Sequence, residues 1–172
     1  DMQLANRHID GTMDKAKTIR MPYIVAPTAQ AYFKELASSN KELFFERLDE
    51  FISIILESSS HVENNTEDEG VILKQGCPDL VPLNCFYING EFVFFDQEFA
   101  FDNYPANMMI CRTIDDIRFM VVSSGGIASE ELFERYYLSD NLDKWREICW
   151  DFISKLRKEG DMAQYYSKVR LD

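Results

Sequence analysis

Two short apolar runs, residues 85–88 and 91–95, are separated only by Asn89-Gly90, and this feature constrains the fold most. Asn and Gly both accept the positive φ that the two central positions of a type I′ turn require. That turn matches the twist of the strands that it joins. The sequence therefore predicts a β-hairpin over residues 85–95.

Three residues with oxygen-bearing side chains flank the predicted hairpin. Asp79 and Asn84 bracket a tight loop before its first strand, and Asp96 follows its second strand. Because a hairpin returns the chain to its starting point, we expect Asp96 to lie beside Asn84 and the Asp79 loop. Proteins hold Mg²⁺ through one or two carboxylates plus the phosphates of a substrate, and a further carboxylate can orient or deprotonate an attacking hydroxyl. The arrangement favours phosphoryl transfer; the alternative is that these are turn and strand-end residues with local roles.

The stretch 76–98 resembles the catalytic and metal-binding segments of kinase-like phosphotransferases. Asp79 and Asn84 have the spacing of the catalytic loop of protein kinases. Asp96-Gln97-Glu98, in place of Asp-Phe-Gly, is more similar to the aminoglycoside and choline phosphotransferase branch. The amino-acid sequence of the whole stretch is more similar still to kinase-like domains appended to bacterial surface-polysaccharide methyltransferases and glycosyltransferases.

The resemblance implies a role for each of these residues. Asp79 would be the catalytic residue and would face the acceptor hydroxyl. Asn84 and Asp96 would bind Mg²⁺ and, through it, ATP, and Glu98 would support the metal site or structure its loop. Residues 1–26 would be the end of the smaller, N-terminal lobe and the hinge, and residues 27–172 would be a helical C-terminal lobe.

The chain departs from this family in two respects. Cys77 stands where the family usually has a His that braces the catalytic loop, and a thiol is a weak hydrogen-bond donor. No glycine-rich loop, and no strand Lys with a partner Glu, can be assigned before the hinge. We therefore expect this chain, which begins at Asp1, to be a piece of a longer protein and to be inactive alone.

Periodicity and capping residues predict that the rest of the chain is mainly helical, so that the fold is α+β overall. Residues 18–25 read as an edge strand, and Gly125-Gly126 as a break between helices. Apolar residues recur every three or four positions over residues 43–56, which predicts an amphipathic helix. The expected helix starts are Thr28, Asn40, Pro105 at the first helical position, Ser129 and Asn141, with Gly160 after the last helix.

The composition excludes several classes of function. A chain of 172 residues with a net charge of −12 reads as one acidic domain, which repels nucleic acid and anionic membranes. It has no apolar run that could span a bilayer. The four cysteines form no CxxC pair, which favours reduced thiols and a cytoplasmic protein. We expect Asp79 to raise the pKa of Cys77, and Trp145 and Trp150 to be packing residues.

Two functions stay open from the sequence. The first is ATP- and Mg²⁺-dependent phosphoryl transfer to a hydroxyl of a sugar or small molecule, in bacterial cell-surface glycan biosynthesis. The second is a catalytically inactive kinase-like module that scaffolds or regulates a fused methyltransferase or glycosyltransferase. The expected partners are therefore glycan-biosynthesis domains and a small acceptor.

Overall fold

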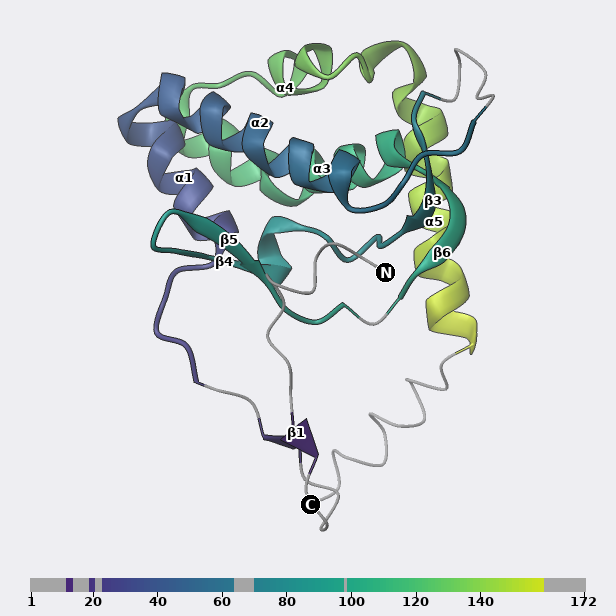
Figure 1. Cartoon of the computed structure of the whole chain (residues 1–172). Helices are drawn as coiled ribbons and strands as arrows, with labels where there is room; N and C mark the ends of the chain where they lie inside the picture. The colour runs from purple at the N-terminus through teal and green to yellow at the C-terminus, as the bar shows by residue number, and fades with distance from the viewer. Residues whose placement is uncertain (1–11, 14–18, 21–22, 64–69, 98, 160–172) are drawn as a thin grey trace.

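A computed structural model describes residues 12–13, 19–20, 23–63, 70–97 and 99–159 of the chain (Figure 1). Helices make up most of these residues, and the strands described form antiparallel sheets of two strands each. The predicted α+β class is confirmed. In chain order the elements are β1 (Thr12–Met13), β2 (Ile19–Arg20), α1 (Ala29–Ser39), α2 (Lys41–Glu57), β3 (Ile72–Gly76), the 3-10 turn η3 (Pro82–Asn84), β4 (Cys85–Ile88), β5 (Glu91–Phe94), β6 (Phe101–Pro105), α3 (Ala106–Gly125), α4 (Ser129–Arg135), the 3-10 turn η4 (Ser139–Asn141) and α5 (Leu142–Glu159).

Capping residues set the ends of α1 and α2 as predicted. The Thr28 hydroxyl accepts a hydrogen bond from the Ala31 N–H at 3.2 Å. Asn40 serves both helices: its N–H donates to the Leu36 carbonyl at the end of α1, and its Oδ1 accepts from the Leu43 N–H at 3.0 Å in the first turn of α2. Such side chains satisfy backbone groups that a helix end leaves without partners.

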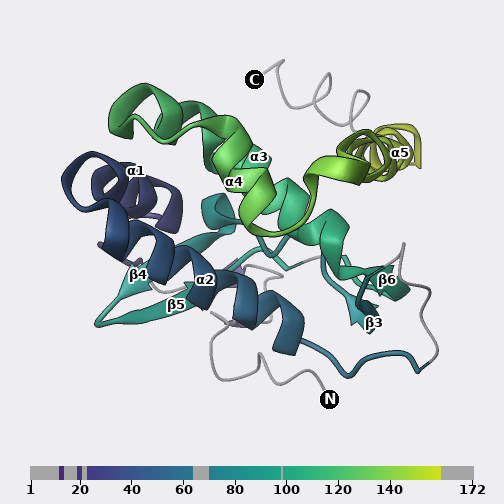
Figure 2. The same cartoon turned by 90° about the horizontal axis from the view of Figure 1, so that it is seen from above.

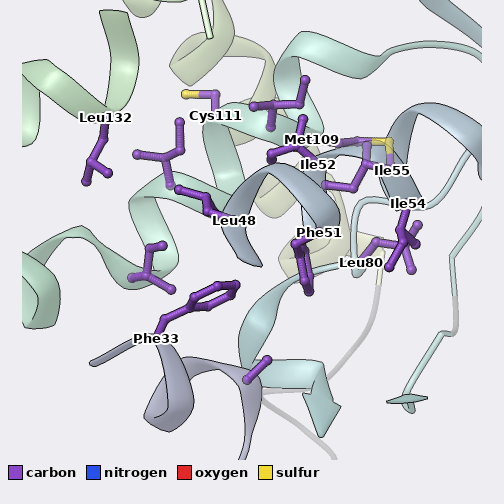
Figure 3. Packing of buried hydrophobic residues seen from close by; sticks show 14 of the residues in the cluster. Phe33, Leu48, Phe51, Ile52, Ile54, Ile55, Leu80, Met109, Cys111 and Leu132 are labelled. Atoms are coloured by element: carbon purple, nitrogen blue, oxygen red, sulfur yellow. The ribbon is translucent and has the colours of Figure 1, made fainter. Parts of the chain in front are cut away.

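Helix α3 is the centre of the fold. It contacts α1, α2, α4 and α5, and Figure 2 shows α1 and α2 along one side of α3 with α5 across from them. Apolar side chains from α1 to α4 meet in one cluster, which Figure 3 shows around Phe33, Leu48 and Phe51. Met109, also in this cluster, is 1% exposed, as expected of a core residue. None of the helices described is long and apolar enough to cross a membrane.

The predicted hairpin is present. Strands β4 and β5 pair antiparallel from Cys85 opposite Phe94 to Ile88 opposite Glu91. Asn89 has a φ of 52° and Gly90 a φ of 88°, the two positive values that the turn requires. The hairpin packs against α1 (Figure 1).

Strands β3 and β6 were not predicted from the sequence. They pair antiparallel, with Ile72 opposite Pro105 and Gly76 opposite Phe101. This pairing places the start of the candidate loop, directly after Gly76, beside the segment that leads into α3. The loop is therefore anchored at both ends, by β3 before it and by the hairpin after it.

Several predicted boundaries were wrong. The strand expected over residues 18–25 is limited, where it is described, to Ile19–Arg20, which pairs with Thr12–Met13. Pro105 ends β6 and precedes the first helical residue of α3. Proline has no backbone N–H to donate, and the end of an edge strand does not require one. Helix α3 extends to Gly125, and Gly126 ends it with a φ of 65°. Gly160 lies outside the described residues.

We expect Gly76→Ala to destabilise the protein by about 1–3 kcal/mol. A Cβ at Gly76 would lie 2.5 Å from the Cβ of Tyr104, so β3 and β6 would have to move apart. Chemical denaturation of the two proteins measures the effect, with Gln75→Ala, an exposed change on the same strand, as the control. An unchanged unfolding midpoint for Gly76→Ala would show that the two strands adjust without cost.

Candidate functional site

The loop from Cys77 to Asn84 is held by hydrogen bonds to the backbone carbonyl of Asp79. The Asn84 Nδ2 donates to this carbonyl at 3.3 Å, and the Gln97 Nε2 donates to it at 3.1 Å. Gln97 also donates to the Phe95 carbonyl at 3.2 Å. Residues from both ends of the hairpin therefore converge on Asp79.

The hairpin brings the backbone of Asp96 beside Asn84. The Phe95 N–H donates to the Asn84 carbonyl at 3.0 Å, one residue before Asp96. Asp96 has a φ of 59° and its side chain is exposed. A left-handed conformation is uncommon for a residue other than glycine, and Asp and Asn adopt it more readily than most. The residue at this turn is therefore both exposed and held in a defined conformation.

Asp79 is paired with Arg112 of α3, a partner that the sequence analysis missed. The Arg112 Nη2 lies 3.4 Å from the Asp79 Oδ1, and both side chains are largely buried. The Arg112 Nε donates to the Pro78 carbonyl at 2.9 Å, which fixes the guanidinium against the loop. The Asp79 carboxylate therefore faces a cation within the protein. The sequence positions of Asp79 and Arg112 gave no sign of this pair, because the pair depends on how α3 packs against the loop.

Cys77 braces the candidate loop indirectly, through Gln97. Its Sγ donates to the Gln97 Oε1 at 3.1 Å, and Gln97 in turn donates to the Asp79 carbonyl. The pKa of Cys77 is raised to about 11, mainly by burial; a hydrogen bond from the Asp79 backbone lowers it, and the nearby charge of Asp79 adds a smaller increase. The predicted direction is confirmed, although burial is the main cause.

We expect the Cys77 thiol to resist alkylation at pH 8 and to react only as the pH approaches 11 or the protein unfolds. The reactive thiolate is the form that burial disfavours. The folded state holds this proton more tightly than the unfolded chain, so the stability it contributes is present below the ordinary thiol pKa and is lost as the pH rises toward 11. Mass-spectrometric mapping after iodoacetamide treatment measures this, with half-buried Cys149 as the internal reference. Equal labelling of Cys77 and Cys149 at pH 8 would contradict the account.

The backbone hydrogen bond from Phe95 to Asn84 brings together the segments that carry two of the predicted metal ligands, Asn84 and Asp96. Asn84 uses Nδ2 to bond Asp79, which leaves its Oδ1 as the end that can bind a cation. Asp96 can supply a carboxylate, and two oxygen ligands with substrate phosphates fit Mg²⁺. Glu98, the third predicted ligand, lies outside the described residues. Within the described ranges, no three or more His, Cys, Asp or Glu side chains gather closely enough to hold a metal.

Asp116 of α3 fixes the turn that carries Asn84. The Leu83 N–H donates to the Asp116 Oδ2 at 3.0 Å, and the Gln30 Nε2 donates to Oδ1 at 3.2 Å. Burial raises the pKa of Asp116 above its usual value, and these hydrogen bonds and Arg112 oppose that effect. The carboxylate therefore links α1, α3 and η3 directly behind Asn84.

An open cleft of about 680 Å³ lies between α3 and α5, and Asn84 forms part of its wall. Trp150, predicted to be a packing residue, is 62% exposed and lines this cleft. Trp145 is 1% exposed, as predicted. The two residues differ because they stand on different faces of α5. The lining residues are Val81, Leu83, Asn84, Arg112, Asp115, Asp116, Arg118, Phe119, Arg146, Cys149, Trp150 and Ile153.

Comparisons with known proteins add no family to this geometry. The chain matches no protein-family model, and a search of curated proteins finds no match to it.

Proposed function

We propose that the intact protein containing this chain is a kinase-like phosphotransferase, which transfers a phosphoryl group from ATP to a hydroxyl of a sugar or small molecule. One observation carries the proposal: residues 95–97 are hydrogen-bonded along the loop from Asp79 to Asn84. Asp79, Asn84 and Asp96 thus come from two segments bonded to each other, as the hairpin argument requires. The reduced, mostly buried cysteines are compatible with a cytoplasmic setting, where ATP is supplied.

Each of these residues has a distinct task in the proposal. Asn84 and Asp96 would hold Mg²⁺, with Glu98 in support, and the bound metal would neutralise charge on the transferred phosphate. Asp79 would orient the acceptor hydroxyl. Cys77 and Gln97 keep the Asp79 backbone in place through their hydrogen bonds. Arg112 pairs with the Asp79 carboxylate and also lines the cleft.

The ion pair between Asp79 and Arg112 also favours a second candidate. A carboxylate that is paired with a guanidinium accepts a proton less readily than a free one. An inactive kinase-like module that scaffolds or regulates a fused methyltransferase or glycosyltransferase of bacterial glycan biosynthesis needs no such base. In that case the same contacts would serve only to hold the loop.

The direct test is transfer of radiolabelled γ-phosphate from ATP by the intact protein to a panel of sugars and glycan intermediates. We expect transfer that requires Mg²⁺ and stops when the metal is chelated. No transfer to any acceptor, together with normal activity of a neighbouring enzyme domain only when this chain is present, would favour the scaffold instead.

The 172-residue chain alone is expected to bind Mg²⁺-ATP weakly and to transfer no phosphate. Much of the stabilisation in phosphoryl transfer comes from positioning the phosphates, and the family's nucleotide-covering strands cannot be assigned in this sequence. Calorimetric titration of the chain with Mg²⁺-ATP measures this. A Kd below about 1 μM, corresponding to roughly 8 kcal/mol of binding free energy, would mean that the nucleotide site lies elsewhere.

A further inference from the structure

The cleft between α3 and α5 gathers positive charge on an acidic protein. The whole sequence has 18 Lys and Arg against 30 Asp and Glu. Three of the arginines, Arg112, Arg118 and Arg146, nevertheless line this one cleft, beside the carboxylates of Asp115 and Asp116. A concentration of cations against the overall balance needs a local explanation.

Asp115 neutralises only one of the two arginines that it contacts. The Arg146 Nε and Nη2 donate to its two oxygens at 3.3 and 3.1 Å. The Arg118 Nε lies 2.6 Å from the Asp115 Oδ1, but among the described residues it makes no hydrogen bond. One carboxylate thus stands between two guanidiniums, and this group of three side chains has a formal charge of plus one. Arg146 remains partly exposed in the cleft, where its other guanidinium N–H groups can donate to an anion.

Two exposed aromatic rings line the same cleft from its two helices. Phe119 of α3 is 69% exposed and Trp150 of α5 is 62% exposed. Large aromatic side chains usually bury their rings, so the exposed Trp150 ring beside a cleft marks a surface for a ligand. The Phe119 ring instead has the Arg118 guanidinium over it, 3.9 Å from the ring centroid. The negative face of such a ring attracts the weakly positive C–H groups of a sugar. Asn84 and Asp116 add oxygens that can accept hydrogen bonds from hydroxyl groups.

We infer that this cleft binds a sugar that carries an anionic oxygen group, a phosphate or a carboxylate, with the anion at Arg146 and the sugar ring at Trp150. If the proposed function holds, this ligand is the acceptor, since Asn84 lies in the wall of the cleft and Arg112 joins the cleft to Asp79. Only the identification of this ligand as the acceptor rests on the proposed function. Binding itself requires neither ATP nor metal.

Calorimetric titration of the 172-residue chain, without ATP or Mg²⁺, tests the inference. The probes are α-D-glucose 1-phosphate and D-glucuronate, with D-glucose, inorganic phosphate and adenosine monophosphate for comparison. We expect the two anionic sugars to bind, and glucose and phosphate to bind at least about tenfold more weakly, because each supplies only half of the contacts. Tighter binding of the nucleotide than of either anionic sugar would overturn the assignment to sugars.

Two variants and one matched control locate the binding. Arg146→Gln keeps a donor but removes the charge, and should weaken binding by about tenfold. Trp150→Ala changes an exposed residue, so it should fold normally and still weaken binding several-fold. Arg135→Gln removes a guanidinium that pairs with Asp49 away from the cleft, and should bind as the unchanged chain does.

Failure of the inference can be told apart from failure of the proposed function. Absence of binding by both anionic sugars, or unchanged binding by Trp150→Ala and by folded Arg146→Gln, would overturn the inference. Binding in the cleft by a protein that transfers no phosphate would defeat the proposed function and support the inference. Transfer of phosphate to a neutral sugar, unaffected by either variant, would support the proposed function and overturn the inference.

Discussion

Asp96→Asn in the intact protein is expected to reduce phosphoryl transfer by at least about 100-fold and to weaken binding of Mg²⁺-ATP at the same time. The carboxylate charge is what the metal requires from this position. The substitution is a mild one for the backbone, because Asn adopts the positive φ of 59° found at Asp96 at least as readily as Asp does. The measurements are steady-state transfer kinetics and nucleotide titration on the same preparation.

Asp79→Asn should affect the same two measurements differently. Its loss should lower turnover by about 100-fold or more while nucleotide affinity stays nearly unchanged, because Asp79 acts on the acceptor. The contacts from Asn84 and Gln97 go to the backbone carbonyl of residue 79, so the loop keeps them. Asp140→Asn, which neutralises an exposed carboxylate in η4, is the control and should change neither measurement. Full transfer activity in both site variants would refute the assigned roles.

Phe51→Ala is expected to lower the free energy of unfolding by about 3–5 kcal/mol. Phe51 is fully buried on α2, and its ring centroid lies 5.1 Å from that of Phe92 and 5.4 Å from that of Phe94. It therefore joins the helical core to the hairpin that positions Asp96. At a few degrees per kcal/mol for a chain of this size, the melting temperature should fall by roughly 10 °C.

Two matched substitutions separate packing from composition. Phe119→Ala removes the same side chain from an exposed position on α3 and should change stability by less than about 0.5 kcal/mol. Phe51→Leu retains most of the buried volume and should cost less than Phe51→Ala. A melting temperature for Phe51→Ala within a degree of the original would show that the hairpin does not depend on this contact.

The elements that the sequence predicted well are those set by neighbouring residues. Asn89-Gly90 needs only its own backbone preferences to make a turn. Thr28 and Asn40 cap helices through bonds to residues three positions away. The return of Asp96 to Asn84 then follows from the hairpin, which is why the backbone of the candidate site was predictable.

The features that were missed depend on contacts between distant segments. Strands β3 and β6 pair with each other although the hairpin lies between them in the sequence. Polar residues such as Gln75 and Asp102 interrupt the apolar pattern that would have indicated strands. The pairing of Arg112 with Asp79 requires the packing of α3 against the loop. Trp150 is apolar and adjoins the buried face of α5, yet the cleft, and not another helix, lies beside it. Periodicity along one helix does not reveal which face has a partner.

The central claim is that Asn84 and Asp96 hold the divalent cation of a phosphotransferase site, and paramagnetic NMR with Mn²⁺ tests it most directly. Mn²⁺ takes the same oxygen ligands as Mg²⁺ and broadens signals of nearby nuclei. In a titration of the ¹⁵N-labelled chain, we predict that the amide signals of Asn84 and Asp96 broaden first, and that Asp96→Asn removes this effect while leaving broadening elsewhere on the acidic surface. Undiminished Asn84 and Asp96 signals at Mn²⁺ concentrations that broaden other acidic sites, or the same pattern in Asp96→Asn, would contradict the claim.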